Sequence, residues 1–364
     1  MPLRSFAATV AVSASITASI TASSTAAAAA PPTPAPPTAS TSSKTASSSV
    51  AAVLVQDGWS VEAVAPGVWA AVAVPTEDGG PLCNAGIVDT GKATIVVDTG
   101  ASPHHGAAIA AIAQRLTGRA PSIAINTHHH DDHTSGNEGL PPGVVVVAAR
   151  PVKAAMIAEW PADLAADAAK ARERLAGAQR ARADAHARND AWDEQEAFLW
   201  ATAFAIQGND ERKAPRTPDV LVDGPLSIDG PAHTVDVVPV GPAHTAGDVL
   251  VVVPDAGVVF TGDVVFVGMH PFVPDGDVAG WKAALARVRA LSPRVIVPGH
   301  GRVAAVGAVA DMERWFKALE DTVATVRREK KKPEDVAVPA AFADWHLRRF
   351  FSIDVVYLSS TAKP

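Results

Sequence analysis

NTHHHDDH, at residues 126–133, is the most informative stretch of this sequence, because it places four ligand-type side chains in the pattern H-x-H-x-D-H. It follows the apolar segment 122–126, which predicts a β-strand that leads directly into a loop. The period of two along a strand turns His128 and His130 the same way, while Asp132 and His133 reach an adjacent position. One short loop can therefore supply ligands to two metal ions.

Three more ligand-type side chains occur where an apolar strand meets a turn that contains Gly or Pro. They are His244 in GPAHTAGD, Asp263 in VVFTGDVVF and His300 in RVIVPGHG. Zinc accepts imidazole nitrogen and carboxylate oxygen, and a catalytic zinc site uses three protein ligands. Because the loop supplies only four ligands, two such sites need residues from elsewhere. The recurrence of one local pattern at separate strand ends indicates a shared site.

The composition narrows the kind of site and the kind of partner. The 364 residues include one cysteine and twelve histidines. Cys83 can therefore form neither an internal disulfide nor a thiolate zinc cage, and its apolar context predicts a small buried side chain. The formal charge of the protein is −7. An acidic protein repels the negatively charged phosphate backbone of nucleic acids, so we expect no nucleic-acid partner.

The first fifty residues differ from the rest in composition, with Arg4 and Lys44 as their only charged residues. Residues 1–30 have a basic start, a modestly apolar middle and alanines at the end, which predicts a signal peptide and a periplasmic or secreted protein. Residues 31–52 are rich in Pro, Ser, Thr and Ala, which predicts a linker. No later apolar run reaches about twenty residues, so we expect no stable membrane insertion.

Residues 53–310 predict one α/β domain with two packed sheets and helices outside them. Four strands are expected up to Val97, where short apolar runs alternate with turn signals. Residues 151–215 are rich in Ala and charged residues and predict an insertion of two or three helices. Residues 311–364 predict a C-terminal helix and a polar tail. Further strands are expected at 122–126, 144–149, 219–223, 233–240, 248–254, 257–263 and 294–300, and helices at 107–116, 281–291 and 312–330.

The ordered motifs resemble those of the metallo-β-lactamase superfamily. They are VVDTG with Asp98, THHHDDH, GPAHT with His244, FTGD with Asp263 and VPGHG with His300, and together they span about Val61 to Arg302. The resemblance implies an αβ/βα four-layer sandwich with metals in the cleft between the sheet edges. It also implies the ligands: His128, His130 and His244 for one metal, Asp132, His133 and His300 for the other, and Asp263 for both. Asp98 would support the ligand loop by hydrogen bonds without binding metal.

This resemblance implies a hydrolase that contains two zinc ions, with iron or manganese as the alternative metals. Two metals about 3.5–4 Å apart can hold a water between them, lower its pKa and polarise a substrate oxygen. The metal-bound hydroxide would attack, and Asp132 would orient it or accept its proton. We therefore expect cleavage of an ester, thioester, lactone or amide-type bond in a small-molecule substrate. The oligomeric state does not follow from the sequence.

Two other functions are open on the same scaffold. The first is a β-lactamase, although the best-known β-lactamases of the superfamily carry Cys where this chain has Asp263, and glyoxalase II-like hydrolases carry Asp. The second is an iron-dependent oxidase or dioxygenase. A protein that has kept the fold without catalysis is disfavoured by the complete ligand set. The natural substrate depends on the shape of loops and insertion, which motif spacing does not report.

The other seven histidines are expected to bind no metal. His129 should point away from its neighbours because side chains alternate along a strand. His270 should either line the substrate entrance or pack within its loop. Exposed positions are expected for His104, His105, His186, His233 and His346. Tryptophans of the insertion should pack its helices onto the domain, with an apolar lid over the site as the alternative; they are Trp160, Trp192 and Trp200.

Overall fold

The computed structural model describes residues 54–77, 79–160, 164–209 and 214–361. The predicted signal peptide and linker, at 1–30 and 31–52, lie outside these residues. Within the described part, no helix has both the length and the apolar character needed to cross a membrane.

The first sheet has eight strands that follow one another in sequence order. They are β1 (Leu54–Gln56), β2 (Trp59–Ala65), β3 (Val68–Ala73), β4 (Ala85–Asp89), β5 (Thr94–Val97), β6 (Ile123–Ile125), β7 (Val145–Ala149) and β8 (Val220–Val222). β1 to β5 pair antiparallel, and β5 to β8 pair in parallel. The prediction of four strands up to Val97 was wrong by one, because Glu62 and small alanines obscure the apolar alternation in β2.

The second sheet has five strands. They are β9 (Leu226–Ile228), β10 (Val235–Pro239), β11 (Val249–Val253), β12 (Val258–Phe266) and β13 (Val295–His300). β9 to β12 pair antiparallel, whereas β13 pairs in parallel with β12. The sequence did not predict β9, because three residues are too few to show a periodic pattern. Every residue of β12 is buried, so this strand carries Asp263 into the interior.

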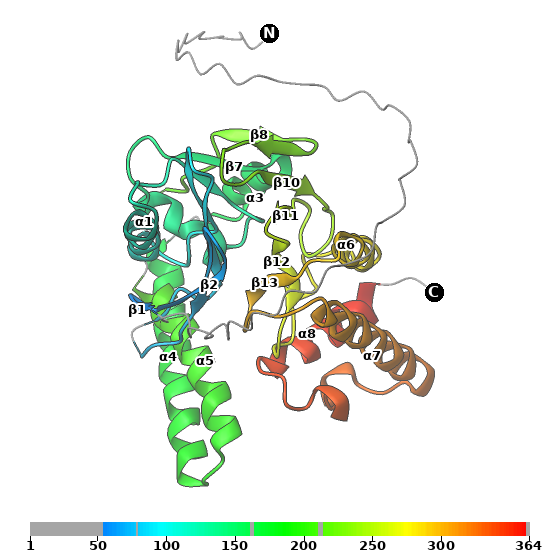
Figure 1. Cartoon of the computed structure of the whole chain (residues 1–364). Helices are drawn as coiled ribbons and strands as arrows, with labels where there is room; N and C mark the ends of the chain where they lie inside the picture. Colours follow the sequence, from blue (N-terminus) through cyan, green and yellow to red (C-terminus); the bar gives the residue numbers. More distant parts are fainter. Residues whose placement is uncertain (1–53, 78, 161–163, 210–213, 362–364) are drawn as a thin grey trace, which may run out of the picture. The chain divides into compact units, whose positions relative to one another are not determined.

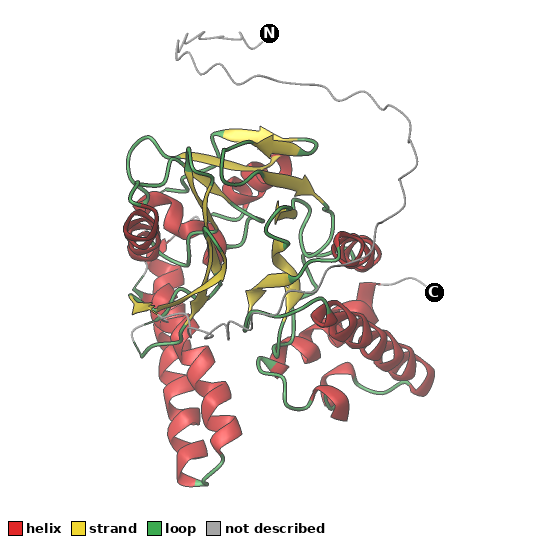
Figure 2. Ribbon diagram, in the orientation of Figure 1, coloured by secondary structure: helices red, strands yellow, loops and turns green. Residues whose placement is uncertain are grey.

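Helices cover the outer face of each sheet and give four layers in the order α, β, β, α (Figures 1 and 2). The main ones are α1 (Pro103–Thr117), α6 (Val278–Leu291) and α7 (Gly307–Glu329). Three apolar cores hold the layers together: Ile109 lies between α1 and the first sheet, Val251 between the sheets, and Trp281 beneath α6 and α7. This arrangement confirms the αβ/βα four-layer sandwich.

Local signals set the bounds of α1, which starts earlier than predicted. The side chain of Ser102 accepts a hydrogen bond from the backbone N–H of His105, and Pro103 occupies the first helical turn. Both features are typical of a helix start. Gly118 ends the helix in the left-handed conformation, with φ of 74°. His105 is therefore part of the helix and packs inward.

The predicted insertion contains three helices. They are α3 (Arg150–Ala158), α4 (Leu164–Ala187) and α5 (Ala191–Gly208). Figure 1 shows α4 and α5 as a hairpin whose far end extends away from the sheets. Shorter helical segments elsewhere are α2 (Asp131–Thr134), η1 (Ser135–Gly139), η2 (Pro333–Asp335) and η3 (Ala340–Phe342).

The prediction of a polar C-terminal tail was wrong, because α8 (Arg348–Thr361) follows the long helix. Phe351 and Val355 stand four residues apart and are both fully buried in the core beneath α7. The polar residues between them hide this apolar stripe in a simple reading of composition. Glu196 of α5 fixes the start of α8, since its carboxylate accepts the backbone N–H groups of Leu347 and Arg348 at 2.7 and 3.1 Å.

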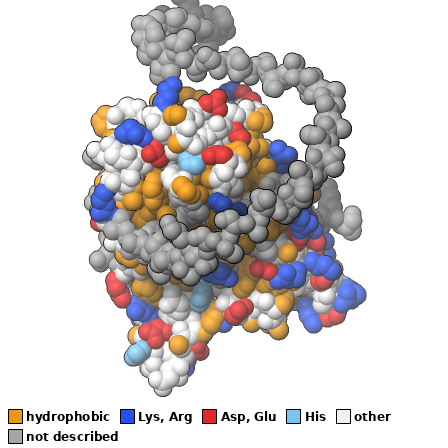
Figure 3. Space-filling model, in the orientation of Figure 1, with side chains coloured by type: hydrophobic (Ala, Val, Ile, Leu, Met, Phe, Trp, Pro, Cys, Tyr) orange, Lys and Arg blue, Asp and Glu red, His pale blue; other side chains and the backbone are white. Residues whose placement is uncertain are grey.

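Acidic and basic side chains are interspersed on the face drawn in Figure 3, with apolar side chains between them. Exposed ion pairs among the described residues include Arg150 with Asp223 and Lys317 with Asp321. Exposed pairs of this kind contribute little to stability.

Candidate metal site

The loop after β6 supplies four of the candidate ligands. His128 and His133 are completely buried, and α2 carries Asp132 and His133 immediately after the loop. The ring centre of His128 lies 4.8 Å from that of His130 and 4.2 Å from that of His133. The loop and the short helix α2 thus bring the four side chains of the motif close together.

The second sheet supplies the other three candidates. Asp263 lies in β12, His300 ends β13, and His244 lies in the turn between β10 and β11. His244 Nε2 lies 2.9 Å from His130 Nδ1, and His300 Nε2 lies 3.2 Å from Asp132 Oδ2. The structure therefore brings all seven predicted ligands together across the two sheets.

The donor atoms fall into two groups, in each of which one atom per residue lies within 4.8 Å of the others. The first group is His128, His130, His244 and Asp263; the second is Asp132, His133 and His300. Asp263 also faces the second group, since its Oδ1 lies 3.2 Å from His133 Nε2 and its Oδ2 lies 3.3 Å from His300 Nε2. This is the position that the sequence predicts for a shared carboxylate.

Unpaired buried atoms show that these residues fit metal ions. Among the described residues, His128 Nε2, His133 Nε2 and Asp263 Oδ1 are buried and make no hydrogen bond, although the last two lie 3.2 Å apart. An unsatisfied buried polar group costs about 1–3 kcal/mol. A cation would satisfy all three atoms, and imidazole with carboxylate is a donor set that zinc prefers. The room around Asp263 depends on Gly299, where a Cβ atom would lie 1.9 Å from Oδ1.

Hydrogen bonds behind the candidate ligands set their orientation. Asp98 accepts from Thr127 N and Thr127 Oγ1 at 2.8 and 2.7 Å, and its Oδ2 lies 2.8 Å from His133 Nδ1. It belongs to neither donor group. His130 Nε2 lies 3.1 Å from Asp275 Oδ2. In both histidines the second ring nitrogen is held by a carboxylate, which turns the first toward the cluster.

Burial and neighbouring charges give the histidines of the site different protonation states. Burial lowers the pKa of His128 well below its usual range and that of His244 to about 3, so both rings are neutral. Burial also opposes charge on His300, but Asp263 and Asp132 raise its pKa to about 10. Neutral imidazole is the form that binds metal. His130 of the first group differs, because its bond to Asp275 raises its pKa against the effect of burial. His128 and His244 are therefore ready for a cation, whereas a cation at His300 must displace a proton.

Asn84 was not predicted, although it links the two sheets beside the site. Its side-chain amide donates to the carbonyl oxygens of Pro298 and Gly301 at 2.9 and 2.7 Å. Its Oδ1 accepts from Ala73 N at 3.0 Å. These bonds tie the first sheet to the turn that carries His300. A single Asn before an apolar strand gives no sequence signal for such a contact.

Asp248 is a second unpredicted residue, and it shapes the turn around His244. Its Oδ2 accepts from Thr245 N at 2.8 Å and from Ala243 N at 3.2 Å. Burial raises the pKa of Asp248 to about 7, against the opposing effect of these bonds from Thr245. The sequence GPAHTAGD contained a usable signal, because Asp in a turn commonly accepts nearby backbone N–H groups.

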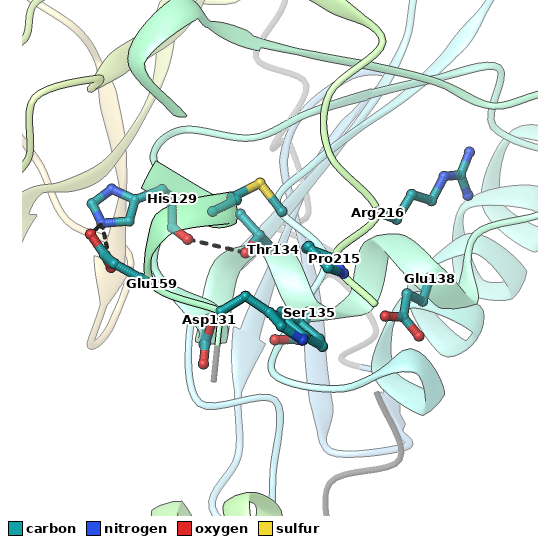
Figure 4. A pocket seen from close by; sticks show the side chains of 10 residues that line it. His129, Asp131, Thr134, Ser135, Glu138, Glu159, Pro215 and Arg216 are labelled. Atoms are coloured by element: carbon teal, nitrogen blue, oxygen red, sulfur yellow. Dashed lines mark hydrogen bonds and ion pairs between the residues drawn. The ribbon is translucent and has the colours of Figure 1, made fainter. Parts of the chain in front are cut away.

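The positions of His129 and His270 agree with the sequence analysis. His129 lies in neither donor group. It lines a small pocket, where its Nε2 lies 2.9 Å from Glu159 (Figure 4). His270 is fully buried, and its Nδ1 accepts from Trp315 Nε1 at 2.9 Å. Packing within its surroundings, and not the substrate entrance, is therefore the role of His270.

The predicted exposure of the other histidines was right for two of them. His104 is exposed, and the side chain of His186 is 78% exposed. The prediction was wrong for His105, which is buried and bonded to Ser102, because α1 starts before it. His233 is only 11% exposed, between Asp255 and a backbone carbonyl. His346 is partly buried because its ring stacks on that of Trp192 at 5.3 Å.

A cavity of about 680 Å³ opens beside the two donor groups. His130, Asp132 and His300 form part of its wall, and α5 forms another part through Trp200 and neighbouring apolar residues. The two tryptophan alternatives thus apply to different residues: Trp200 lines the cavity, whereas Trp192 packs against His346. Trp160 lines the small pocket beside His129.

Comparison with known proteins gives a family for this chain and several similar solved structures. Residues 78–300 match the sequence model of the metallo-beta-lactamase superfamily. Among solved structures, a metallo-beta-lactamase from Pontibacter korlensis shares 18% identity, with 71% of this chain and 99% of that chain covered and a TM-score of 0.48. The metallo-beta-lactamase FIM-1 from Pseudomonas aeruginosa, in its mono-zinc form, shares 20% identity over 69% of this chain and 92% of that chain, with a TM-score of 0.47.

A third structure is similar over a larger part of this chain. It is the stereoselective inverting sec-alkylsulfatase Pisa1 from Pseudomonas sp., with 14% identity and a TM-score of 0.57. The alignment covers 83% of this chain and 50% of that chain. At this level of identity the similarity concerns the fold.

Proposed function

The chain is a metal-dependent hydrolase of the metallo-beta-lactamase superfamily, and we propose that it uses two zinc ions to cleave an ester, thioester, lactone or amide-type bond in a small molecule. The position of Asp263 carries this proposal. Its Oδ2 lies 3.3 Å from Nε2 of both His244 and His300, which belong to different donor groups. A carboxylate shared by two sets of nitrogen donors suits a pair of divalent cations.

We propose the following ligands: His128, His130 and His244 for one cation, Asp132, His133 and His300 for the other, and Asp263 for both. Bound cations would polarise the scissile carbonyl and increase the acidity of water. Iron and manganese are the alternatives to zinc, since imidazole and carboxylate also bind them.

Asp132 can accept the proton of an attacking water. Its side chain is 24% exposed and lines the cavity, so a water molecule there can approach the carboxylate. Burial would raise the pKa of Asp132, but His133 and His300 lower it to about 2, which keeps it ionised. Cys83 does not compete as a nucleophile. Its thiol is buried, bonds to the carbonyl oxygen of Asp132, and has a pKa that burial raises to about 12.

The experiment is a substrate screen on the zinc-loaded protein, with metal content measured on the same sample. Chromogenic esters, thioesters, lactones and the cephalosporin nitrocefin would be compared. We expect turnover of at least one of the first three classes, and loss of at least about a hundred-fold in kcat for Asp132→Ala and His130→Ala with the fold retained. His104→Ala is the matched control, because His104 is exposed on α1.

Each other outcome has a defined meaning. Full activity of Asp132→Ala or His130→Ala would contradict the two-cation mechanism. Preferential nitrocefin turnover that a chelator abolishes would assign β-lactam hydrolysis instead. Iron bound in the protein as purified, before zinc loading, together with oxygen consumption, would assign an oxidase or dioxygenase.

We also propose that the protein is exported to the periplasm or secreted. The support is the composition of residues 1–30, with Arg4 near the start and alanines Ala26 to Ala30 at the end. Mass spectrometry of the protein from the periplasm of an expressing bacterium should find a chain shortened near these alanines. A full-length chain confined to the cytoplasm would contradict the proposal.

A further inference from the structure

Besides the donor groups, a few other charged residues, and the polar Thr202 and Gln207 of α5, the lining of the 680 Å³ cavity consists largely of apolar and aromatic side chains, which form an apolar wall. They come from segments far apart in the sequence: Leu199, Trp200, Phe204 and Ile206 from α5, Met269 and Phe272 after β12, and Leu347 and Phe350 at α8. The volume is within the range of a typical small-molecule site.

Aromatic contacts hold this wall in place. The ring of Phe350 lies edge to face with Trp200 at 5.2 Å and with Phe272 at 5.4 Å, while Phe204 stacks on Trp200 at 5.8 Å. Glu196 adds a polar tie, because it accepts from Trp200 Nε1 at 3.3 Å as well as from the backbone at the start of α8. Aromatic side chains of the insertion and α8 therefore contact one another in the lining of the cavity.

The charges around the cavity restrict what it accepts. Arg302 is the only lysine or arginine among the described residues that line it, whereas Glu159, Asp131 and Asp275 add negative charge to the donor groups. Apart from the proposed cations, a highly phosphorylated or polycarboxylate substrate would find only one lysine or arginine partner in the described lining. An uncharged apolar group finds complementary surface along α5 and α8.

We propose that the substrate carries an apolar acyl chain, which lies along α5 and α8 while its carbonyl faces the two donor groups. This inference rests on the proposed hydrolytic function and specifies its substrate class. The apolar wall would then select substrates by chain length, because each buried methylene adds to binding.

The test is a series of p-nitrophenyl esters with a constant leaving group, from acetate through butanoate and hexanoate to octanoate, on the zinc-loaded enzyme. A fully buried methylene strengthens binding by about four-fold, so kcat/KM should rise about two- to four-fold per methylene from butanoate to octanoate. A flat or falling profile would overturn the proposal.

Two variants locate the effect. Ala203 lines the cavity on α5, so Ala203→Phe should lower the octanoate-to-acetate ratio of kcat/KM by at least about ten-fold. Ala169→Phe places the same side chain at an exposed position on α4 and should leave the ratio at the wild-type value. An unchanged ratio in Ala203→Phe, with folding verified by circular dichroism, would overturn the assignment of the wall.

Calorimetric titration with butanoic, hexanoic and octanoic acids separates this inference from the proposed reaction. If the wild-type enzyme hydrolyses no ester, thioester, lactone or amide, the proposed function fails, and these carboxylic acids still report on the cavity. Affinity that increases with chain length and decreases in Ala203→Phe supports the apolar site. Affinity independent of chain length overturns it.

Discussion

Asp354 in α8 provides a pH-dependent test of the structure that is independent of catalysis. Its side chain is fully buried, and Oδ1 accepts from Val273 N at 2.9 Å while Oδ2 has no partner among the described residues. Burial raises its pKa from 3.8 to about 8, with the bond from Val273 opposing the change. The folded protein therefore binds this proton at pH values where the unfolded chain has released it.

The sign of the stability effect follows from that difference. Between about pH 4 and 8 the native state holds one proton more than the unfolded state, so the free energy of unfolding falls as the pH rises. The slope is at most about 1.4 kcal/mol per pH unit. The stabilisation is complete below the unfolded pKa and is lost as the pH passes the folded pKa, and the full loss amounts to about 6 kcal/mol.

Asp354→Asn removes the titration and keeps the size and the acceptor for Val273. We expect the stability of the variant relative to the wild type to increase by about 3 kcal/mol between pH 5.5 and 8. Urea unfolding at fixed zinc concentration and a series of pH values measures this difference, in which the titration of the metal site cancels. Asp335→Asn, at an exposed position, should give a constant difference. A constant difference for Asp354→Asn would refute the assigned protonation.

Three other predictions concern the site and its support. Removal of cations by a chelator should lower the Tm by several degrees, and zinc should restore it, because a ligand at 100 times its Kd adds about 2.7 kcal/mol to the free energy of unfolding. Thermal melts with and without zinc measure this change. An unchanged Tm would contradict a structural role for the cations. Asp98→Asn should reduce zinc affinity about ten- to a hundred-fold, since His133 loses its carboxylate partner; competition with a chromophoric chelator tests this, and wild-type affinity would show that Asp98 does not act through His133. Glu196→Gln should cost about 1–2 kcal/mol in urea unfolding, because a neutral amide replaces the carboxylate at the start of α8; no loss would mean that this contact adds nothing to stability.

The fold could be predicted from the sequence where the apolar pattern was long or the motif was ordered. The two sheets, their outer helices and the helical insertion all followed from such patterns. The strands β9 and β2 could not be predicted. β9 has only three residues, and polar and small residues in β2 weaken its apolar alternation. The helix α8 was missed because its buried face consists of few residues and is stabilised by tertiary packing.

The candidate ligands were predictable because each stands at a strand end in a recognisable motif, and the structure brings all seven together. Their supporting residues were less visible. Asn84 and Asp275 act across the gap between segments that are far apart in the sequence, and a single polar residue gives no indication of its distant partner. Asp248 is different, since it acts within its own turn and the signal was local.

The division of labour between the sheets and the hairpin has a consequence for how this enzyme can change. The candidate ligands lie on strands, loops and the short helix α2 of the sandwich, whereas much of the cavity wall lies on α5. Mutations in α5 can therefore alter which molecules are accepted without displacing a ligand. The hairpin is the natural segment for laboratory evolution, and exchanging it between related chains should transfer selectivity while the reaction stays the same.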